Sequence, residues 1–322
     1  MRPGLFTAIA AFISLSAAPS VAAQYIFTTV DFAGADFGTF LYGLNDAGAA
    51  VGTAQFKDGS QGNRSFVYES GAFSTVDIPG SSPSATVAYS LNNDGYTAGG
   101  YQDFPSTGVR GFIETGSGFQ SVDVPGANPT EVHRVNNLGD AVGSYTAPGS
   151  IARSFLLSGG TLSYIDVPWD SDYTDAWDIN DGGDIVGSYG VDGVSHGFLL
   201  SGGAFTMIDV PGALRTSVMG INNAGAIAGH YTSATGVHGF VFENGVYTTI
   251  DHPLADSLTF VMDINNDGSL VGFFNTAGGY SEYTHGFIAD VGVPEPATWA
   301  LLLVGFGLGG ASLRQRRRAA SI

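Results

Sequence analysis

The sequence contains no cysteine, so no disulfide bond can stabilise the protein. It also has few basic residues, because 11 Lys and Arg stand against 29 Asp and Glu, which gives a formal net charge of −18. A surface this acidic repels nucleic acid and anionic membranes and does not provide the basic patch that nucleic-acid binding requires. We therefore expect a protein that is stabilised by packing alone and that has no nucleic-acid partner.

Glycine and β-forming residues are abundant, since 48 of the 322 residues are Gly and Val, Thr, Phe and Tyr are frequent. A nine-residue phrase recurs six times, as "LNDAGAAVG", "LNNDGYTAG", "VNNLGDAVG", "INDGGDIVG", "INNAGAIAG" and "INNDGSLVG". Its Asn and its two glycines never vary. An Asn that opens a turn and a Gly that closes it at positive φ predict a tight hairpin turn between two apolar strands.

The repeat extends beyond this turn. A phrase such as "TVDF" or "IDVP" recurs at spacings of 42 to 46 residues, and a phrase such as "HGFLL" follows each turn. Each unit reads as four short strands, which is the strand content of a propeller blade. The domain opens with the fourth-strand phrase at residues 25–32 and ends with the third-strand phrase at residues 284–291. We predict an all-β fold for residues 24–291, a six-bladed β-propeller of four-stranded blades closed by the N-terminal strand; the alternative is an open β-solenoid.

Two segments outside this domain have the features of sorting signals. Residues 1–23 place Arg2 before an apolar run and end in "VAA", so we predict a secretory signal peptide that is cleaved between Ala23 and Gln24. Residues 292–322 contain a Pro-Glu-Pro triplet, an apolar stretch at about 297–313 that is long enough to cross a bilayer, and a basic end. The residues that carry this second signal are Pro294, Glu295, Pro296, Trp299, Arg316, Arg317 and Arg318.

This tail resembles the PEP-CTERM sorting signal of Gram-negative bacteria. The resemblance implies transient anchoring by a transmembrane helix, processing by an exosortase-like membrane peptidase, and delivery to the cell surface or beyond it, in a biofilm and exopolysaccharide setting. The repeats in turn resemble the HAF family of extracellular repeats, which implies the same location and no chemistry. An ordinary C-terminal membrane anchor is the alternative explanation of the tail.

The sixth copy of the turn also begins like a calcium-binding loop. Asp263, Asn265 and Asp267 alternate and Gly268 follows, but the twelfth position, where such a loop needs a bidentate carboxylate, is Phe274. Other copies place Leu or Ala where a ligand is required. We therefore expect a structural turn, keep Asp263, Asn265 and Asp267 as a calcium candidate, and predict no other cofactor.

Two further polar positions recur in the repeats. An Asp near the end of each fourth strand is expected to accept backbone hydrogen bonds where the chain crosses to the next unit. The other position holds His in three units and Arg in three, namely His196, His238, His285, Arg64, Arg110 and Arg153. Because arginine is not a metal ligand, these histidines do not predict a metal cluster.

The best candidate for a ligand site is the loop in which one repeat departs from the others. Most units carry small residues between the fourth strand and the next first strand, whereas the fourth unit carries "PWDSDYTDAWD". Aromatic rings beside carboxylates can stack on sugars and accept hydroxyl hydrogen bonds, so this loop predicts a carbohydrate-binding or calcium-assisted patch, unless it is a local packing variation. The candidate ligand residues are Trp169, Asp170, Asp172, Tyr173, Asp175 and Trp177.

A second candidate patch consists of His133, Arg134 and Arg215, whose positive charge stands out in an acidic chain. No catalytic triad is visible. We therefore predict a non-catalytic module that binds exopolysaccharide or a surface protein. The alternatives are a secreted polysaccharide hydrolase or lyase on a propeller scaffold, and a structural coat component. A pair of unrepeated carboxylates that converge in the channel would favour the enzyme.

Overall fold

The structure is a computed structural model that describes residues 25–57, 62–78, 81–103, 108–276 and 284–292. The predicted signal peptide with its cleavage site, and the sorting tail after residue 292 with its helix, lie outside these residues. In the described part of the chain, no helix is long and apolar enough to cross a membrane.

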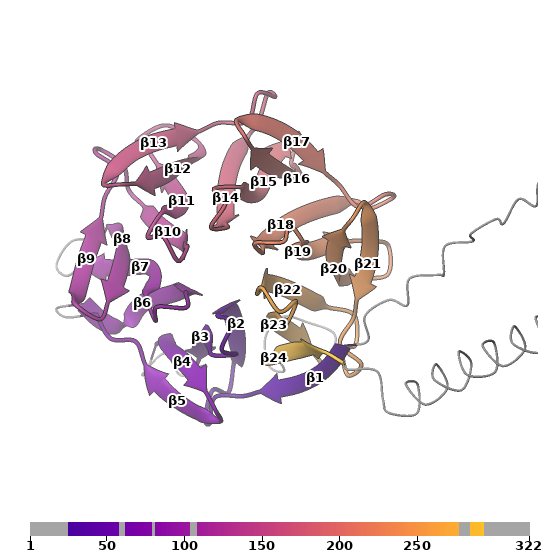
Figure 1. Cartoon of the computed structure of the whole chain (residues 1–322). Coiled ribbons are helices and arrows are strands. Elements are labelled where there is room, and N and C mark those ends of the chain that lie inside the picture. Colours follow the sequence, from indigo (N-terminus) through magenta and orange to yellow (C-terminus); the bar gives the residue numbers. More distant parts are fainter. Residues whose placement is uncertain (1–24, 58–61, 79–80, 104–107, 277–283, 293–322) are drawn as a thin grey trace, which may run out of the picture.

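Every element in the described part of the chain is a β-strand, and the 24 strands lie in a ring around a central axis (Figure 1). This arrangement is a β-propeller, as the repeat length and strand content predict. Within each repeat, consecutive strands run antiparallel from the axis outward. The innermost strands are β2 (Gly38–Leu44), β6 (Ser81–Leu91), β10 (Thr130–Val135), β14 (Tyr173–Ile179), β18 (Arg215–Ile221) and β22 (Thr259–Ile264).

The remaining strands follow in order of distance from the axis. The second strands are β3 (Ala50–Gln55), β7 (Thr97–Asp103), β11 (Ala141–Thr146), β15 (Ile185–Val191), β19 (Ile227–Thr232) and β23 (Leu270–Asn275). The third strands are β4 (Arg64–Glu69), β8 (Val109–Thr115), β12 (Ala152–Ser158), β16 (Val194–Ser201), β20 (Val237–Glu243) and β24 (Thr284–Val291). The outermost strands are β5 (Ala72–Thr75), β9 (Gly118–Val122), β13 (Thr161–Ile165), β17 (Ala204–Ile208), β21 (Val246–Ile250) and β1 (Tyr25–Val30).

The prediction of six separate four-stranded blades needs a correction. Four repeats form separate four-stranded sheets, but the last and first repeats share one eight-stranded sheet. A parallel pair between Gly38 of β2 and Thr284 of β24 joins them. Gly38 permits this contact, because a Cβ atom there would lie only 2.9 Å from the Thr284 Cβ.

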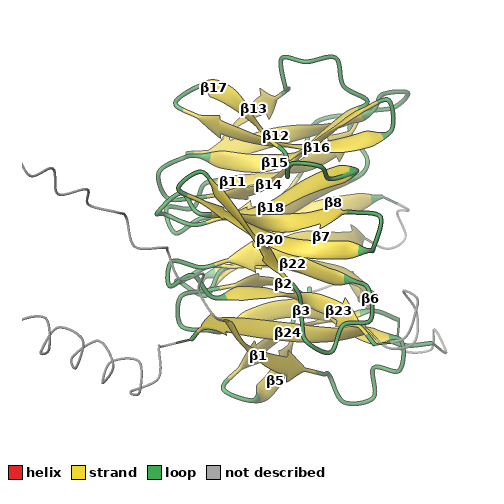
Figure 2. Cartoon of the chain, turned by 90° about the vertical axis from the view of Figure 1, so that its right-hand side faces the viewer, coloured by secondary structure: helices red, strands yellow, loops and turns green. Residues whose placement is uncertain are grey.

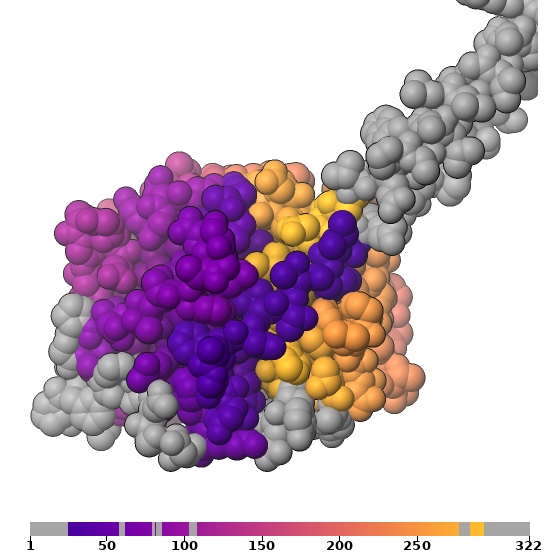
Figure 3. All heavy atoms as spheres, turned by 90° about the horizontal axis from the view of Figure 1, so that it is seen from below, coloured from indigo at the N-terminus to yellow at the C-terminus, as the bar shows by residue number. Residues whose placement is uncertain are grey.

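The N-terminal strand closes the ring. β1 pairs antiparallel with β24 from Tyr25–Val291 to Val30–Gly286, so the first strand of the chain completes the sheet of the last repeat (Figure 3). Both ends of the described domain therefore lie side by side. They lie on the face where each inner strand turns into the second strand, which we call the asparagine face, and the opposite face is called the crossing face (Figure 2).

Glycine and phenylalanine make the contact between successive strands of a repeat. The third strands bury Phe66, Phe112, Phe155, Phe198, Phe240 and Phe287, each 0% exposed. Each ring lies beside the second invariant glycine of the nine-residue phrase; a Cβ at Gly187 would lie 2.1 Å from the Asp175 carbonyl oxygen and 2.9 Å from Phe198. The first invariant glycine has the predicted positive φ, for example 80° at Gly183. The two glycines thus serve different purposes.

Candidate functional site

A β-bulge in each inner strand brings side chains to the axis. The pairing of every inner strand with its second strand shifts register near the residue two before the turn Asn, as between Val132 and Arg134. A bulge redirects a side chain that regular alternation would send elsewhere. The residues at this position differ from repeat to repeat and are Gly43, Ser90, Arg134, Asp178, Gly220 and Asp263.

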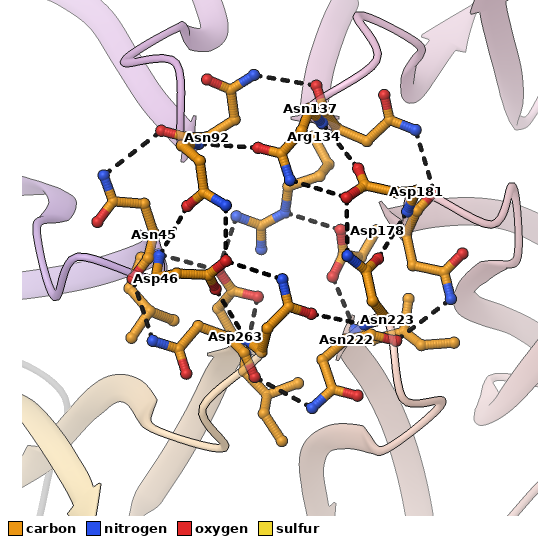
Figure 4. A pocket seen from close by; sticks show the side chains of 18 of the residues that line it. Asn45, Asp46, Asn92, Arg134, Asn137, Asp178, Asp181, Asn222, Asn223 and Asp263 are labelled. Atoms are coloured by element: carbon orange, nitrogen blue, oxygen red, sulfur yellow. Dashed lines mark hydrogen bonds and ion pairs between the residues drawn. The ribbon is translucent and has the colours of Figure 1, made fainter.

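The six turn asparagines form a closed ring of hydrogen bonds around the axis (Figure 4). The Nδ2 of each donates to the backbone oxygen of the asparagine in the next repeat, over 3.0–3.4 Å, and Asn265 of the last repeat donates to Asn45 of the first. A second ring lies beside it, in which the backbone N–H of the following residue donates to the side-chain oxygen of its counterpart, over 2.8–2.9 Å. We call the two rings the asparagine belt; its members are Asn45, Asp46, Asn92, Asn93, Asn136, Asn137, Asn180, Asp181, Asn222, Asn223, Asn265 and Asn266.

Two aspartates replace asparagine in the second ring of the belt. Asp46 Oδ2 accepts from Asn93 and Asn266 at 2.6 and 2.9 Å, and Asp181 Oδ2 accepts from Asn137 and Asn223 in the same way. Burial raises the pKa of each carboxyl, but the hydrogen bonds from the neighbouring asparagines outweigh burial and lower it. Both carboxylates are therefore ionised acceptors at neutral pH.

Arg134 blocks the axis behind the belt. Its guanidinium contacts Asp178 at 3.0 Å and Asp263 at 2.8 Å, and the three side chains are only 4–9% exposed. The carboxylates also accept backbone N–H groups, from Ile179 and Ile221 at 2.7 Å for Asp178. Burial raises the pKa of both carboxyls, against the charge of Arg134, and the pKa of Asp263 reaches about 7. We call Arg134, Asp178 and Asp263 the axial ion triad. It links three repeats of the ring, two of which are distant in sequence.

Two of the three calcium-candidate residues already use their side-chain oxygens within the protein. The carboxylate of Asp263 accepts from Leu44 N and Ile264 N besides Arg134, and Asn265 Oδ1 accepts from Asp267 N and Ser269 N. No group of three or more His, Cys, Asp or Glu in the described part of the chain is arranged to hold a metal. The geometry therefore gives Asp263 and Asn265 a structural role beside the turn, in which Asp267 takes part through its backbone N–H.

On the other side of the triad, six larger side chains fill the axis. They are Tyr42, Tyr89, His133, Trp177, Met219 and Met262, and together with Arg134 they enclose a space of only about 10 Å³. Trp177 stacks on His133 with ring centres 4.2 Å apart. His133 Nδ1 donates to the Ala176 carbonyl oxygen at 2.9 Å. This layer separates the belt from the crossing face.

An open cavity of about 400 Å³, the axial cavity, lies between inner strands β14, β18 and β22, above this layer toward the crossing face. Its lining combines aromatic rings, methionines, hydroxyls and two titratable groups. The lining residues are Tyr173, Asp175, Trp177, Ser188, Ser217, Met219, His230, Phe260, Met262 and Phe273. Pockets of this size and mixed character are typical of small-molecule sites.

The titratable groups of the axial cavity are incompletely partnered. Asp175 Oδ1 and His230 Nδ1 are buried and have no hydrogen-bond partner among the described residues. Burial raises the pKa of Asp175, the charge of His133 lowers it and that of Glu131 raises it further. Burial lowers the pKa of His230 to about 4, with the backbone of Val261 acting in the opposite sense, so this ring is neutral at pH 7.

The structure divides the predicted ligand loop between two places. Tyr173, Asp175 and Trp177 line the axial cavity. Trp169 instead stacks on Tyr189, with ring centres 4.9 Å apart, and packs against the core between sheets.

The two remaining carboxylates of this loop lie elsewhere. Asp170 is exposed, and Asp172 is exposed and accepts Gly193 N at 3.0 Å. The second candidate patch is divided as well, because His133 and Arg134 lie on the axis while Arg215 begins β18 beside another recess, lined by His196 and Asp209.

Sequence reasoning missed seven lining residues, namely Ser188, Ser217, Met219, His230, Phe260, Met262 and Phe273. A signal for them exists in their positions within the repeat. Ser217 and Phe260 lie five residues before the turn Asn, Met219 and Met262 lie three residues before it, and the other three directly follow the second glycine. All three positions vary among repeats.

Five of the six recurrent Asp residues pair with the His or Arg of their own sheet, whereas the sequence predicted that they mainly accept backbone hydrogen bonds; the sixth, Asp77, accepts a hydrogen bond from Thr75 Oγ1 at 2.9 Å. The contacts are His196–Asp209 at 2.8 Å, His238–Asp251 and His285–Asp31 at 2.9 Å, Arg153–Asp166 at 3.0 Å and Arg110–Asp123 at 3.5 Å. These pairs join the third and fourth strands near the crossing face and are part of the scaffold.

Comparison with known proteins gives one family match. Residues 292–318 match the PEP-CTERM protein-sorting motif. The chain carries a PEP-CTERM sorting signal. Such a signal indicates an exported protein of a Gram-negative bacterium, with a membrane-anchored sorting stage and processing by an exosortase. A search of curated proteins finds no match.

Several solved structures resemble the PEP-CTERM chain in fold. A protein of unknown function from Dyadobacter fermentans is 11% identical with a TM-score of 0.51, over 83% of this chain and 99% of that one. A lectin from Aleuria aurantia, solved with Fucα1-6GlcNAc, is 11% identical with a TM-score of 0.50, over 83% and 97%. TolB from Acinetobacter baumannii is 11% identical with a TM-score of 0.51, over 79% and 64%. At these identities the likeness shows the fold alone.

Proposed function

We propose that the protein is an exported, non-catalytic binding module that takes a saccharide unit of an exopolysaccharide into its axial cavity. The observation that carries this proposal is the composition of the cavity. Equivalent positions of a repeat surround the axis, yet the side chains at these positions differ, and one sector alone combines Trp177, Phe260 and Phe273 with Asp175 and His230. A scaffold does not need such differences.

The chemistry of the lining suits a sugar. Aromatic rings can lie against the apolar face of a pyranose, while hydroxyls and an unpartnered carboxylate oxygen bind its hydroxyl groups. Burial in a cavity strengthens each of these hydrogen bonds. The lectin similarity is compatible with this function but does not add weight to it beyond the fold.

The proposal includes the route by which the protein reaches its site of action. Cleavage after Ala23 would release residues 24–291 as the mature propeller, followed by the sorting tail of residues 292–322 until an exosortase-like peptidase removes it. The resemblance of the repeats to HAF-type extracellular repeats agrees with a location at the cell surface or in the biofilm matrix. A surface protein is the alternative partner, and a structural coat is the alternative role.

The test measures saccharide binding by isothermal titration calorimetry. Neutral, acidic and basic oligosaccharides are titrated into the full-length chain in mild detergent. Released reducing ends are assayed in the same samples. Trp177→Ala and Phe260→Ala should each weaken binding by about tenfold, since stacking contributes about 0.5–1.5 kcal/mol beyond the burial of the ring. Tyr164→Ala, which removes an aromatic ring that is 58% exposed, should leave binding unchanged. If no saccharide binds, the proposal is wrong.

A second function, polysaccharide hydrolysis or cleavage by a lyase, is supported by one observation. Glu131 and Asp175 occupy equivalent positions on the neighbouring strands β10 and β14, neither carboxylate recurs in the other repeats, and the charge of Glu131 raises the pKa of Asp175. A carboxyl with a raised pKa is suited to act as a general acid beside an ionised partner. Product release that is lost in both Asp175→Asn and Glu131→Gln would establish the enzyme.

A further inference from the structure

The axial cavity has an unbalanced negative charge. Asp175 Oδ1 is buried without a hydrogen-bond partner among the described residues, and no Lys or Arg is among the residues that line the cavity in this part of the chain. The nearest basic group is His133, 3.4 Å from this oxygen. Its Nδ1–H donates to the Ala176 carbonyl oxygen at 2.9 Å, so this hydrogen is directed at the backbone and not at the carboxylate, and its Nε2 lies 3.4 Å from Ser144 Oγ.

Arg134 makes its ion pairs with other carboxylates. Its single positive charge is shared by Asp178 and Asp263 in the axial ion triad. Glu131 adds another carboxylate whose charge acts on Asp175. The side chain of Asp175 is 23% exposed, but its Oδ1 is buried without a hydrogen bond and two carboxylates share His133 as the nearest basic group, so a positively charged ligand would relieve a cost that the site bears.

The walls of the cavity favour a cation as well. Trp177, Phe260 and Phe273 present aromatic surface near Asp175, and Phe260 and Phe273 stack with ring centres 4.7 Å apart. Aromatic faces attract ammonium groups, with a gain that grows when water is excluded. Met219 and Met262 add polarisable surface that adapts to a ligand.

We infer that the axial cavity selects an ammonium-bearing saccharide, an amino sugar whose ammonium group meets Asp175 Oδ1 while its apolar face lies on Trp177 and Phe260. This inference rests on the proposed function and names its substrate class. Two hydroxyls favour a sugar over a simple amine. Ser188 Oγ accepts from Val218 N at 3.1 Å, which leaves its O–H to donate, and Ser217 Oγ has a hydrogen bond with Ser195 Oγ at 3.3 Å that leaves its second position open to a ligand. Sugar hydroxyls can use both groups.

The experiment compares four probes by titration into the full-length chain in detergent. They are glucosamine oligosaccharides, the corresponding N-acetylglucosamine and glucose oligosaccharides, and cyclohexylamine as an amine without hydroxyls. The free-amine oligosaccharide should bind at least about tenfold more tightly than the two neutral saccharides. Its advantage should vanish in Asp175→Asn and persist in Asp192→Asn, a matched change at an exposed turn residue with φ 51°, which Asn tolerates.

The pH dependence provides a second measurement if Asp175→Asn does not fold. Binding of the ammonium requires the ionised carboxylate, so it should weaken as the pH falls through the raised pKa of Asp175, while binding of a neutral saccharide should not. Equal affinity for glucosamine and glucose oligosaccharides would overturn the inference and leave the proposed function intact. If cyclohexylamine bound as tightly as the glucosamine oligosaccharides, the saccharide part of the inference would be overturned. Binding of none of the probes would overturn both proposals.

Discussion

Replacement of Arg134 by Met would test whether the axial ion triad is held together by charge. Methionine keeps most of the length and the apolar stem of arginine but removes the guanidinium. It would leave Asp178 and Asp263, each no more than 5% exposed, side by side without a counter-ion. Both would keep their backbone N–H donors, so the change isolates the ionic part of the cluster.

The expected cost is about 3–5 kcal/mol at neutral pH, the range for removal of one partner from a buried ion pair. Protonation of the stranded carboxyls limits this cost. A carboxyl whose folded pKa is raised binds protons more tightly in the folded than in the unfolded state, so its destabilising effect grows as pH rises through that pKa and is relieved below it. The loss in free energy of unfolding caused by Arg134→Met should therefore be larger at about pH 8 than at about pH 5.

Denaturant unfolding, followed by tryptophan fluorescence and circular dichroism at both pH values, would measure this deficit. Arg153→Met is the control, because Arg153 and Asp166 form a similar pair at the surface, 31% and 58% exposed. Its loss should cost at most about 1 kcal/mol at either pH. A loss below about 1 kcal/mol for Arg134→Met at pH 8 would refute the reasoning, and a deficit independent of pH would show that packing, not charge, explains it.

Three further predictions concern the scaffold. Gly187→Ala should destabilise the fold by several kcal/mol in denaturant unfolding, because its Cβ would meet a carbonyl oxygen at 2.1 Å, whereas Gly116→Ala, with open space around it, should be neutral; equal effects would contradict the packing argument. His252 is buried and its pKa is lowered to about 4 by burial and by the charge of His285, so the unfolded state binds more protons and stability should fall from about pH 6.5 to 4. His252→Phe should make this acid loss shallower, and an unchanged slope would exclude His252 as its source. Deletion of residues 293–322 should leave a folded, monodisperse domain by circular dichroism and size exclusion, and aggregation would show that the tail belongs to the fold.

The repeats made the architecture predictable. Six copies of one turn, with a fourth-strand phrase at the start and a third-strand phrase at the end, predict a ring that the first strand closes, and β1 pairs with β24 accordingly. The join between the last and first repeats was not predictable, because it depends on the approach of Gly38 to Thr284, residues at opposite ends of the chain. The pattern within a repeat contains no information about such a contact.

The axial site was only partly predictable for a related reason. Trp169 and Trp177 are eight residues apart in one unusual loop, which suggested a common patch. Trp169 precedes β14 and packs between sheets, whereas Trp177 lies within β14 and faces the axis. Besides Tyr173, Asp175 and Ser188 of its own repeat, the neighbours of Trp177 in the cavity come from other repeats, so those could be found only by comparing equivalent positions around a closed ring.

The pairing of Tyr25 with Val291 also places both ends of the described domain on one face of the propeller. Both chain ends leave the propeller at the asparagine face, where Ser269 beside the last turn bonds to Asp290 at 2.9 Å. The axial cavity opens toward the opposite face, beyond the layer of Trp177 and Met262. The segment that follows residue 292 therefore begins on the face opposite the mouth of the cavity, so a group attached to the chain at that point would start away from the mouth.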